Sequence, residues 1–110
     1  MSTLDFSSIF NAMLKAAKDS LADKWPAVEE LGTSSFKSLA QELIDIEMLR
    51  LNNKITDEQA RLLLDMNKGT LKIVLLSIEG IGLVAAEEAI NAALNAVKNV
   101  VNTALGFVLL

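Results

Sequence analysis

Charged residues are distributed very unevenly along this chain. Of its 24 charged side chains, 19 lie in residues 1–68, and the last 42 residues carry only five. No charged residue follows Lys98. Because a helix or strand that faces water needs polar residues on its exposed side, most of the surface of the second part must be covered. The cover can be the rest of the chain, another chain or lipid.

The composition excludes most classes of enzyme and of nucleic-acid-binding protein. The 110 residues include no Cys and no His, which removes disulfides, thiolate nucleophiles, zinc–thiolate sites and the commonest general base. The net charge of −4 argues against binding to nucleic-acid phosphates, which needs clustered Lys and Arg. We therefore expect a non-enzymatic protein with no cofactor, no metal site, no nucleic-acid partner and no evident small-molecule substrate.

Residues 1–54 are predicted to form amphipathic helices. Within residues 9–21, apolar side chains recur three and four positions apart, which is the spacing of one helix face. A break is expected at Pro26, because the residue before a proline disfavours the helical conformation. Residues 32–35 are either a second break or a weak point within a helix that starts at Pro26. That helix should end near Asn52, at a turn-favouring pair of asparagines.

Thr56 begins the most clearly marked helix of the chain. Its side chain can cap the helix, and Gln59, three residues later, completes a capping box. Asp57 and Arg61 are four residues apart in the orientation that favours an ion pair on a helix.

The end of this helix is less well marked. Gly69 can be a C-terminal stop, or the helix can continue through it. From Thr70 to about Leu105 we expect one long, continuous and apolar helix. The sequence thus predicts a single all-α domain over 1–110, with amphipathic helices in 1–54. In residues 56–110 the capped helix leads into the long C-terminal helix, giving a bundle or hairpin of three to four helices that is completed by oligomerisation.

Four asparagines line one face of the expected C-terminal helix. They step by four, four and three positions, and they are Asn91, Asn95, Asn99 and Asn102. Three interpretations are consistent with this polar stripe. It can face solvent while the other faces are buried, fix the register between chains of an oligomer, or line a water-filled pore.

The apolar faces of the same helix are expected to form an oligomer interface. Small residues repeat four positions apart, as at Ala85/Ala89 and Ala89/Ala93, and let helices approach closely. The apolar ending, residues 105–110, is expected to pack against another copy of the chain. The expected interface residues are Leu83, Ala86, Ile90, Leu94, Val97, Val101, Leu105, Phe107 and Leu110.

These features favour a structural or assembly subunit that self-associates through residues 70–110 as a homo-oligomer. The alternative is a membrane-active protein, pore-forming, toxin-like or holin-like, that inserts the same segment. Each apolar run in it is interrupted by a charge, Glu79 in residues 73–86 and Lys98 in residues 89–110, which makes insertion costly. A third hypothesis is a small enzyme or ligand carrier whose apolar cavity binds a lipid-like molecule.

A cytoplasmic location is the default expectation. The amino terminus has Asp5 where a secretory signal has basic residues, and no long apolar run follows. Signal-independent export and membrane association stay open as alternatives.

Overall fold

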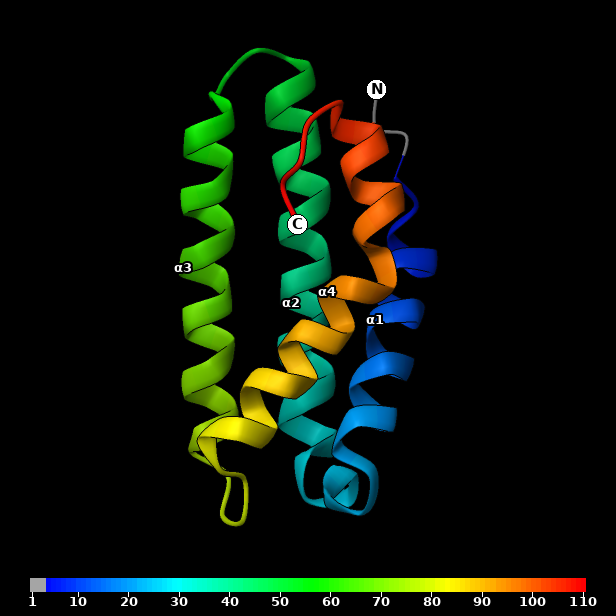
Figure 1. Ribbon diagram of the computed structural model, residues 1–110, viewed down its shortest axis with the longest axis vertical. Coiled ribbons are helices and arrows are strands. Elements are labelled where there is room, and N and C mark those ends of the chain that lie inside the picture. Colours follow the sequence, from blue (N-terminus) through cyan, green and yellow to red (C-terminus); the bar gives the residue numbers. More distant parts are fainter. Residues whose placement is uncertain (1–3) are drawn as a thin grey trace.

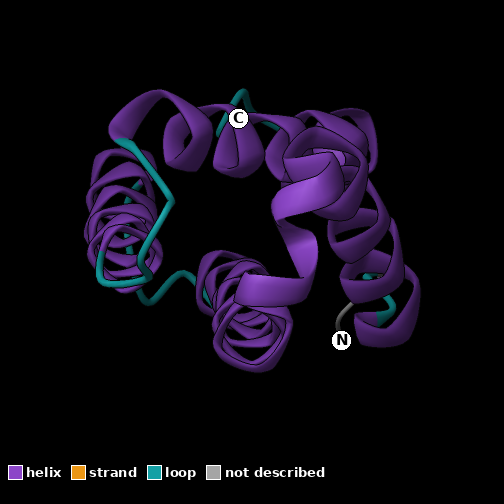
Figure 2. Cartoon of the chain, turned by 90° about the horizontal axis from the view of Figure 1, so that it is seen from below, coloured by secondary structure: helices purple, strands orange, loops and turns teal. Residues whose placement is uncertain are grey.

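The computed structural model describes residues 4–110, and this part of the chain is an all-α bundle. Its helices are α1 (Phe6–Leu21), α2 (Trp25–Leu51), α3 (Asp57–Leu76) and α4 (Leu83–Leu105), with a short 3-10 turn, Ala22–Lys24, after α1. The bundle measures 42 × 23 × 19 Å. Helix α2 packs against both α1 and α3, and α4 runs diagonally from the lower end of α3 to the upper part of α1 (Figures 1 and 2). The predicted all-α helical bundle is confirmed.

Helix α1 begins at a side-chain cap and buries the predicted face. The carboxylate of Asp5 accepts hydrogen bonds from the backbone N–H and the hydroxyl of Ser8, at 3.0 and 2.6 Å. These bonds to the charged form hold the pKa of Asp5 below its usual value. The buried side chains of α1 recur at the helical spacing that the sequence predicts: Ile9, Met13, Ala17 and Leu21.

Helix α2 starts with Pro26 in its first turn and runs without a break to Leu51. Gly32 is therefore a point of close packing within the helix. A Cβ atom at Gly32 would lie 2.5 Å from the Val28 side chain and 3.6 Å from the ring of Trp25. The predicted end of this helix is confirmed, since Asn52 is its C-terminal cap.

The capping box at the start of α3 is confirmed. The Gln59 N–H donates to Thr56 Oγ1 at 3.1 Å, and the Thr56 N–H donates to Gln59 Oε1 at 2.9 Å. The predicted Asp57–Arg61 pair is wrong. Asp57 pairs instead with Arg50 at 2.8 Å, because the end of α2 lies beside the start of α3.

The expected continuous helix over residues 70–105 is also wrong. Helix α3 continues through Gly69 to Leu76, residues 77–82 form a turn, and α4 begins at Leu83. In the turn, Gly80 has a φ of +92°, a conformation that glycine adopts without steric cost. The turn also buries Ile81. Two packed helices bury more apolar surface than one long helix would, and this outweighs the lost helical bonds.

The charge-poor part of the chain thus contributes one face of α4 to the core of the bundle. The buried side chains of α4 point toward the other helices, and the largest contact of α4 is with α1. Within the range that the structure describes, no helix combines the length and the apolarity that crossing a membrane requires.

Candidate functional site

The predicted interface of α4 is covered mainly by the chain's own helices. Five of its nine residues are buried in the core: Ala86, Ile90, Leu94, Val97 and Val101. Three are half-buried against that core: Leu105, Phe107 and Leu110. Only Leu83, at the start of α4, is an exposed member of this set. In this fold most of the predicted interface residues are therefore packed against the chain's own helices.

The four asparagines of α4 have two different environments. Asn91, Asn95 and Asn99 are exposed. Asn102 holds the carboxyl-terminal segment, since its Oδ1 accepts hydrogen bonds from the N–H groups of Leu109 and Leu110 at 2.9 and 3.0 Å. The four asparagines thus do not share one role: three are exposed, and the fourth binds the carboxyl-terminal segment.

The carboxyl-terminal segment packs on its own chain. Leu109 is buried, and the guanidinium carbons of Arg50 and Arg61 lie 5.5 and 5.3 Å from the centroid of the Phe107 ring. Arg61 also donates to the carbonyl oxygen of Val108 at 3.2 Å. Side chains of α2, α3 and α4 of the same chain thus supply these contacts of the segment, which was expected to pack against another copy.

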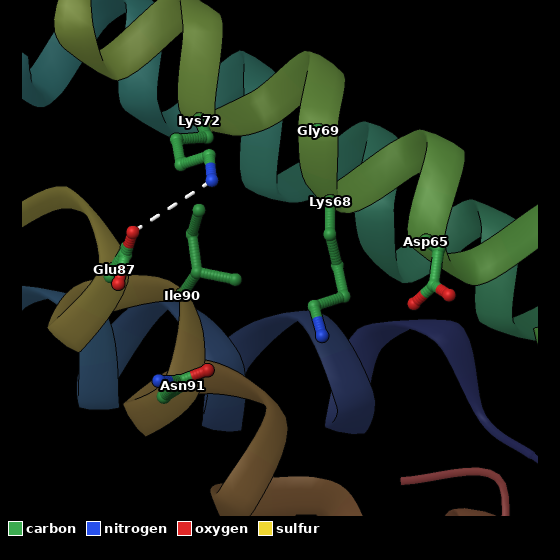
Figure 3. Close-up of a pocket in the computed structure, with 7 residues that line it drawn as sticks. All are labelled: Asp65, Lys68, Gly69, Lys72, Glu87, Ile90 and Asn91. Carbon is green, nitrogen blue, oxygen red and sulfur yellow. Dashed lines mark ion pairs between the residues drawn. The ribbon is translucent and has the colours of Figure 1, made fainter. Parts of the chain in front are cut away.

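A polar groove of about 410 Å³ separates α3 from α4. Figure 3 shows Lys68 and Lys72 of α3 above Asn91 of α4, with Asp65 and Glu87 at the sides. Lys72 and Glu87 are 3.8 Å apart, and both side chains are about half exposed. The groove thus has two lysines between two carboxylates. Residues 4–110 hold no cluster of three or more acidic side chains arranged to bind a metal ion.

The outer face of α3 is apolar and faces away from the bundle. Its four large side chains are between 41% and 69% exposed, and they are Leu62, Met66, Ile73 and Leu76. With Gly69 they recur at steps of four, three, four and three residues, opposite the buried face of α3, which is formed by Ala60, Leu64, Leu71 and Leu75. We call these five positions, Leu62, Met66, Gly69, Ile73 and Leu76, the α3 stripe. Helix α3 lies at one edge of the bundle in both views (Figures 1 and 2).

Gly69 has no packing function within its own chain. A Cβ atom at this position would meet no other atom within 4 Å. A glycine inside a helix costs about 1 kcal/mol relative to alanine. Gly69 lines the groove between α3 and α4, and nothing within the chain requires a glycine there.

Sequence reasoning missed the α3 stripe, although a signal for it is present. Helix α3 has large apolar residues on two opposite faces, and only one of them can face the core of a small bundle. Glu47 was also missed. It is fully buried, and its Oε1 accepts a hydrogen bond from the N–H of Leu4 at 3.2 Å. Its position four residues after the buried Leu43 was the available signal.

No family model, no curated protein and no solved structure matches this chain. Its function is therefore inferred from its own surface chemistry. Among the described residues, the α3 stripe contains four of the twelve large apolar side chains that are exposed, and it is the one regular arrangement among them.

Proposed function

We propose that this protein is a non-enzymatic structural or assembly subunit that associates with copies of itself through the α3 stripe. The observation that carries the proposal is the stripe's spacing: steps of four and three residues on an exposed helix face are the pattern by which helices pair. The absence of Cys and His from the whole sequence supports a non-catalytic role.

The expected association is weak and reversible. Helix α3 has 20 residues, so its stripe is about 30 Å long. Pairing along one helix of this length gives an interface at the small end of the range for specific complexes, and a dissociation constant on the order of micromolar. The chain already has its own core, so association does not need to accompany folding.

The test is the mass of the full chain in solution, measured by light scattering after size exclusion. Ile73→Asp places a carboxylate in the stripe, and Val100→Asp is the matched control on α4. Both side chains are exposed, 69% and 51%, so neither change disturbs the core. We expect the wild-type chain and Val100→Asp to form dimers and Ile73→Asp to be monomeric. A wild-type chain that stays monomeric at every concentration would overturn the proposal.

A membrane-active role is the second candidate, and it is favoured by exposed apolar residues at one end of the bundle, two of which also belong to the α3 stripe. Around the turn between α3 and α4, four large apolar side chains are exposed: Ile73, Leu76, Leu83 and Val84. This end of the bundle can contact a lipid surface. Flotation with neutral and with anionic vesicles tests it, using Val84→Asp at this end and Leu62→Asp at the other. Membrane contact through this end predicts that only Val84→Asp reduces binding, and a chain that binds neither kind of vesicle excludes this role.

A further inference from the structure

We infer that two copies of this chain pair antiparallel along α3, with Asp65 of each copy facing Lys72 of the other. The inference rests on the self-association proposed above and adds its direction and register. Each helix makes the same contacts in such a pair, which is the symmetric arrangement that most homodimers adopt.

The stripe defines which residues lie beside the interface. When two helices pair through apolar residues spaced alternately by four and three, the contact repeats every seven residues. The residue that precedes every second apolar residue then lies at the edge of the contact, where charged side chains of the two helices interact. Asp65 directly precedes Met66, and Lys72 directly precedes Ile73. Both therefore lie on the same edge of the stripe, and in an antiparallel pair this edge of one helix lies along the same edge of its partner.

Opposing the two charges fixes the contacts of the apolar residues. When Asp65 faces the partner's Lys72, Leu62 faces the partner's Ile73, and Met66 faces the partner's Gly69. A flexible methionine thus lies over the position where a Cβ atom would meet nothing within 4 Å. Met66 and the partner's Gly69 thus pack in the same layer of the interface. The interface extends along nearly the whole of α3.

The neighbouring antiparallel registers are disfavoured by charge. A shift of one helix by seven residues in one direction places Lys72 opposite the partner's Lys72. The same shift in the other direction places Asp65 opposite the partner's Asp65. Like charges repel in both cases, and each shift also leaves one end of the stripe without a partner. The sequence of α3 thus distinguishes one register from its neighbours.

A parallel pair fits the same residues less well. It would set Gly69 against the partner's Gly69 and leave an unfilled space at the centre of the contact. It would also place Asp65 beside the partner's Thr70, and Lys72 beside the partner's Ser77, so neither charge gains a partner of opposite sign. Packing and charge both favour the antiparallel direction.

The contact that Lys72 makes within its own chain does not prevent this pairing. Its ammonium group is 3.8 Å from the carboxylate of Glu87, and the two side chains are 41% and 50% exposed. A long contact between exposed groups is weak. Lys72 can therefore face a second carboxylate from the partner while it stays near Glu87.

Disulfide formation tests the direction, because the chain has no cysteine of its own. Leu62→Cys and Ile73→Cys are prepared as separate full-length variants and oxidised alone and as an equal mixture. The antiparallel pair predicts a crosslinked dimer that contains one copy of each variant, and little crosslinking of either variant alone. Val100→Cys gives the level of random collision. Efficient crosslinking of each variant with itself would overturn the antiparallel direction.

Charge exchange tests the register independently. Asp65→Lys and Lys72→Asp each create like-charge contacts across the interface. We expect each to raise the dissociation constant of the dimer about tenfold. The double variant Asp65→Lys/Lys72→Asp restores both pairs and should return to the wild-type dissociation constant. Lys72→Asp also places a carboxylate near Glu87 of the same chain, which can lower the stability of the monomer. Thermal unfolding at low concentration is therefore measured for all variants, to separate this effect from a change in dimerisation.

The outcomes separate the two proposals. If the wild-type chain dimerises but the double variant is no stronger than the single variants, the register is wrong and self-association stands. If the wild-type chain does not dimerise at all, the proposed function itself fails.

Discussion

At the scale of single residues, Asn102 has the most specific structural role. Its side chain holds Leu109 and Leu110 through two backbone N–H groups, and Leu109 is buried. We expect Asn102→Ala to reduce the free energy of unfolding by about 1 to 2 kcal/mol, because these hydrogen bonds are lost and the segment detaches.

Urea denaturation and amide hydrogen exchange at residues 109 and 110 measure this effect. Asn99→Ala is the control, since Asn99 is exposed on the same helix, and it should change stability by less than about 0.5 kcal/mol. Equal effects of the two substitutions would show that Asn102 does not anchor the segment.

Glu42 makes stability depend on pH. Partial burial and then the neighbouring charge of Asp45 raise its pKa above the usual value of 4.5, although Asn67 donates a hydrogen bond to its Oε2 at 3.3 Å. The folded chain therefore holds this proton more tightly than the unfolded chain. The contribution of Glu42 to the free energy of unfolding is largest below pH 4.5 and falls as pH rises through its folded-state pKa.

Glu42→Gln removes this dependence. We expect the variant to gain stability relative to the wild-type chain as pH rises from below 4.5 to neutrality. Because the side chain is only partly buried, the gain should be less than about 1 kcal/mol. Urea unfolding of both proteins across this pH range measures it, and a difference that does not change with pH would contradict the assignment.

At the scale of helices and turns, two glycines should respond to alanine with opposite signs. Gly69 lies inside α3 and faces open space, so Gly69→Ala should stabilise the isolated chain by about 1 kcal/mol. Gly80 has a φ of +92° in the turn after α3, so Gly80→Ala should destabilise it by about 1 to 2 kcal/mol. Unfolding is measured at low concentration, where association contributes little. Shifts of the same sign would contradict this account of the α3–α4 turn.

The helix boundaries that could be predicted are those set by neighbouring residues. Pro26 at the start of α2 and the Thr56–Gln59 box at the start of α3 act locally, so the sequence alone indicated both. The end of α3 depends on the burial of Ile81 against helices that are distant in sequence. Local patterns in residues 70–105 therefore favoured one continuous helix, and the turn could not be predicted from them.

The burial of the predicted interface residues within their own chain could not be predicted for a related reason. The apolar excess of residues 70–110 indicated that α4 must be covered, and one face of α4 is buried in the core. The sequence did not show that α1 of the same chain supplies most of the cover. Once α1 occupies that face, α3 is the helix with an unpaired apolar face, and its spacing was visible in the sequence from the start.

At the scale of the whole molecule, the residues that form the core differ from those proposed to form the association surface. The core uses the inner faces of the helices. The large side chains of the α3 stripe are exposed, and α3 lies at one edge of the bundle (Figure 1). A substitution in the stripe should therefore change the mass in solution and leave unfolding of the isolated chain nearly unchanged. A substitution in the core, such as Leu75→Ala, should reduce stability by about 2 to 5 kcal/mol.

Sedimentation equilibrium of the full chain in detergent-free buffer tests self-association through α3 most directly. The wild-type average mass should rise with concentration from the single-chain value of 11.9 kDa toward twice that value. Ile73→Asp should remain at the single-chain mass over the same range, because a carboxylate in the stripe opposes burial. A wild-type mass that stays at 11.9 kDa throughout, or an identical curve for Ile73→Asp, would contradict the assignment of the α3 stripe as the association surface.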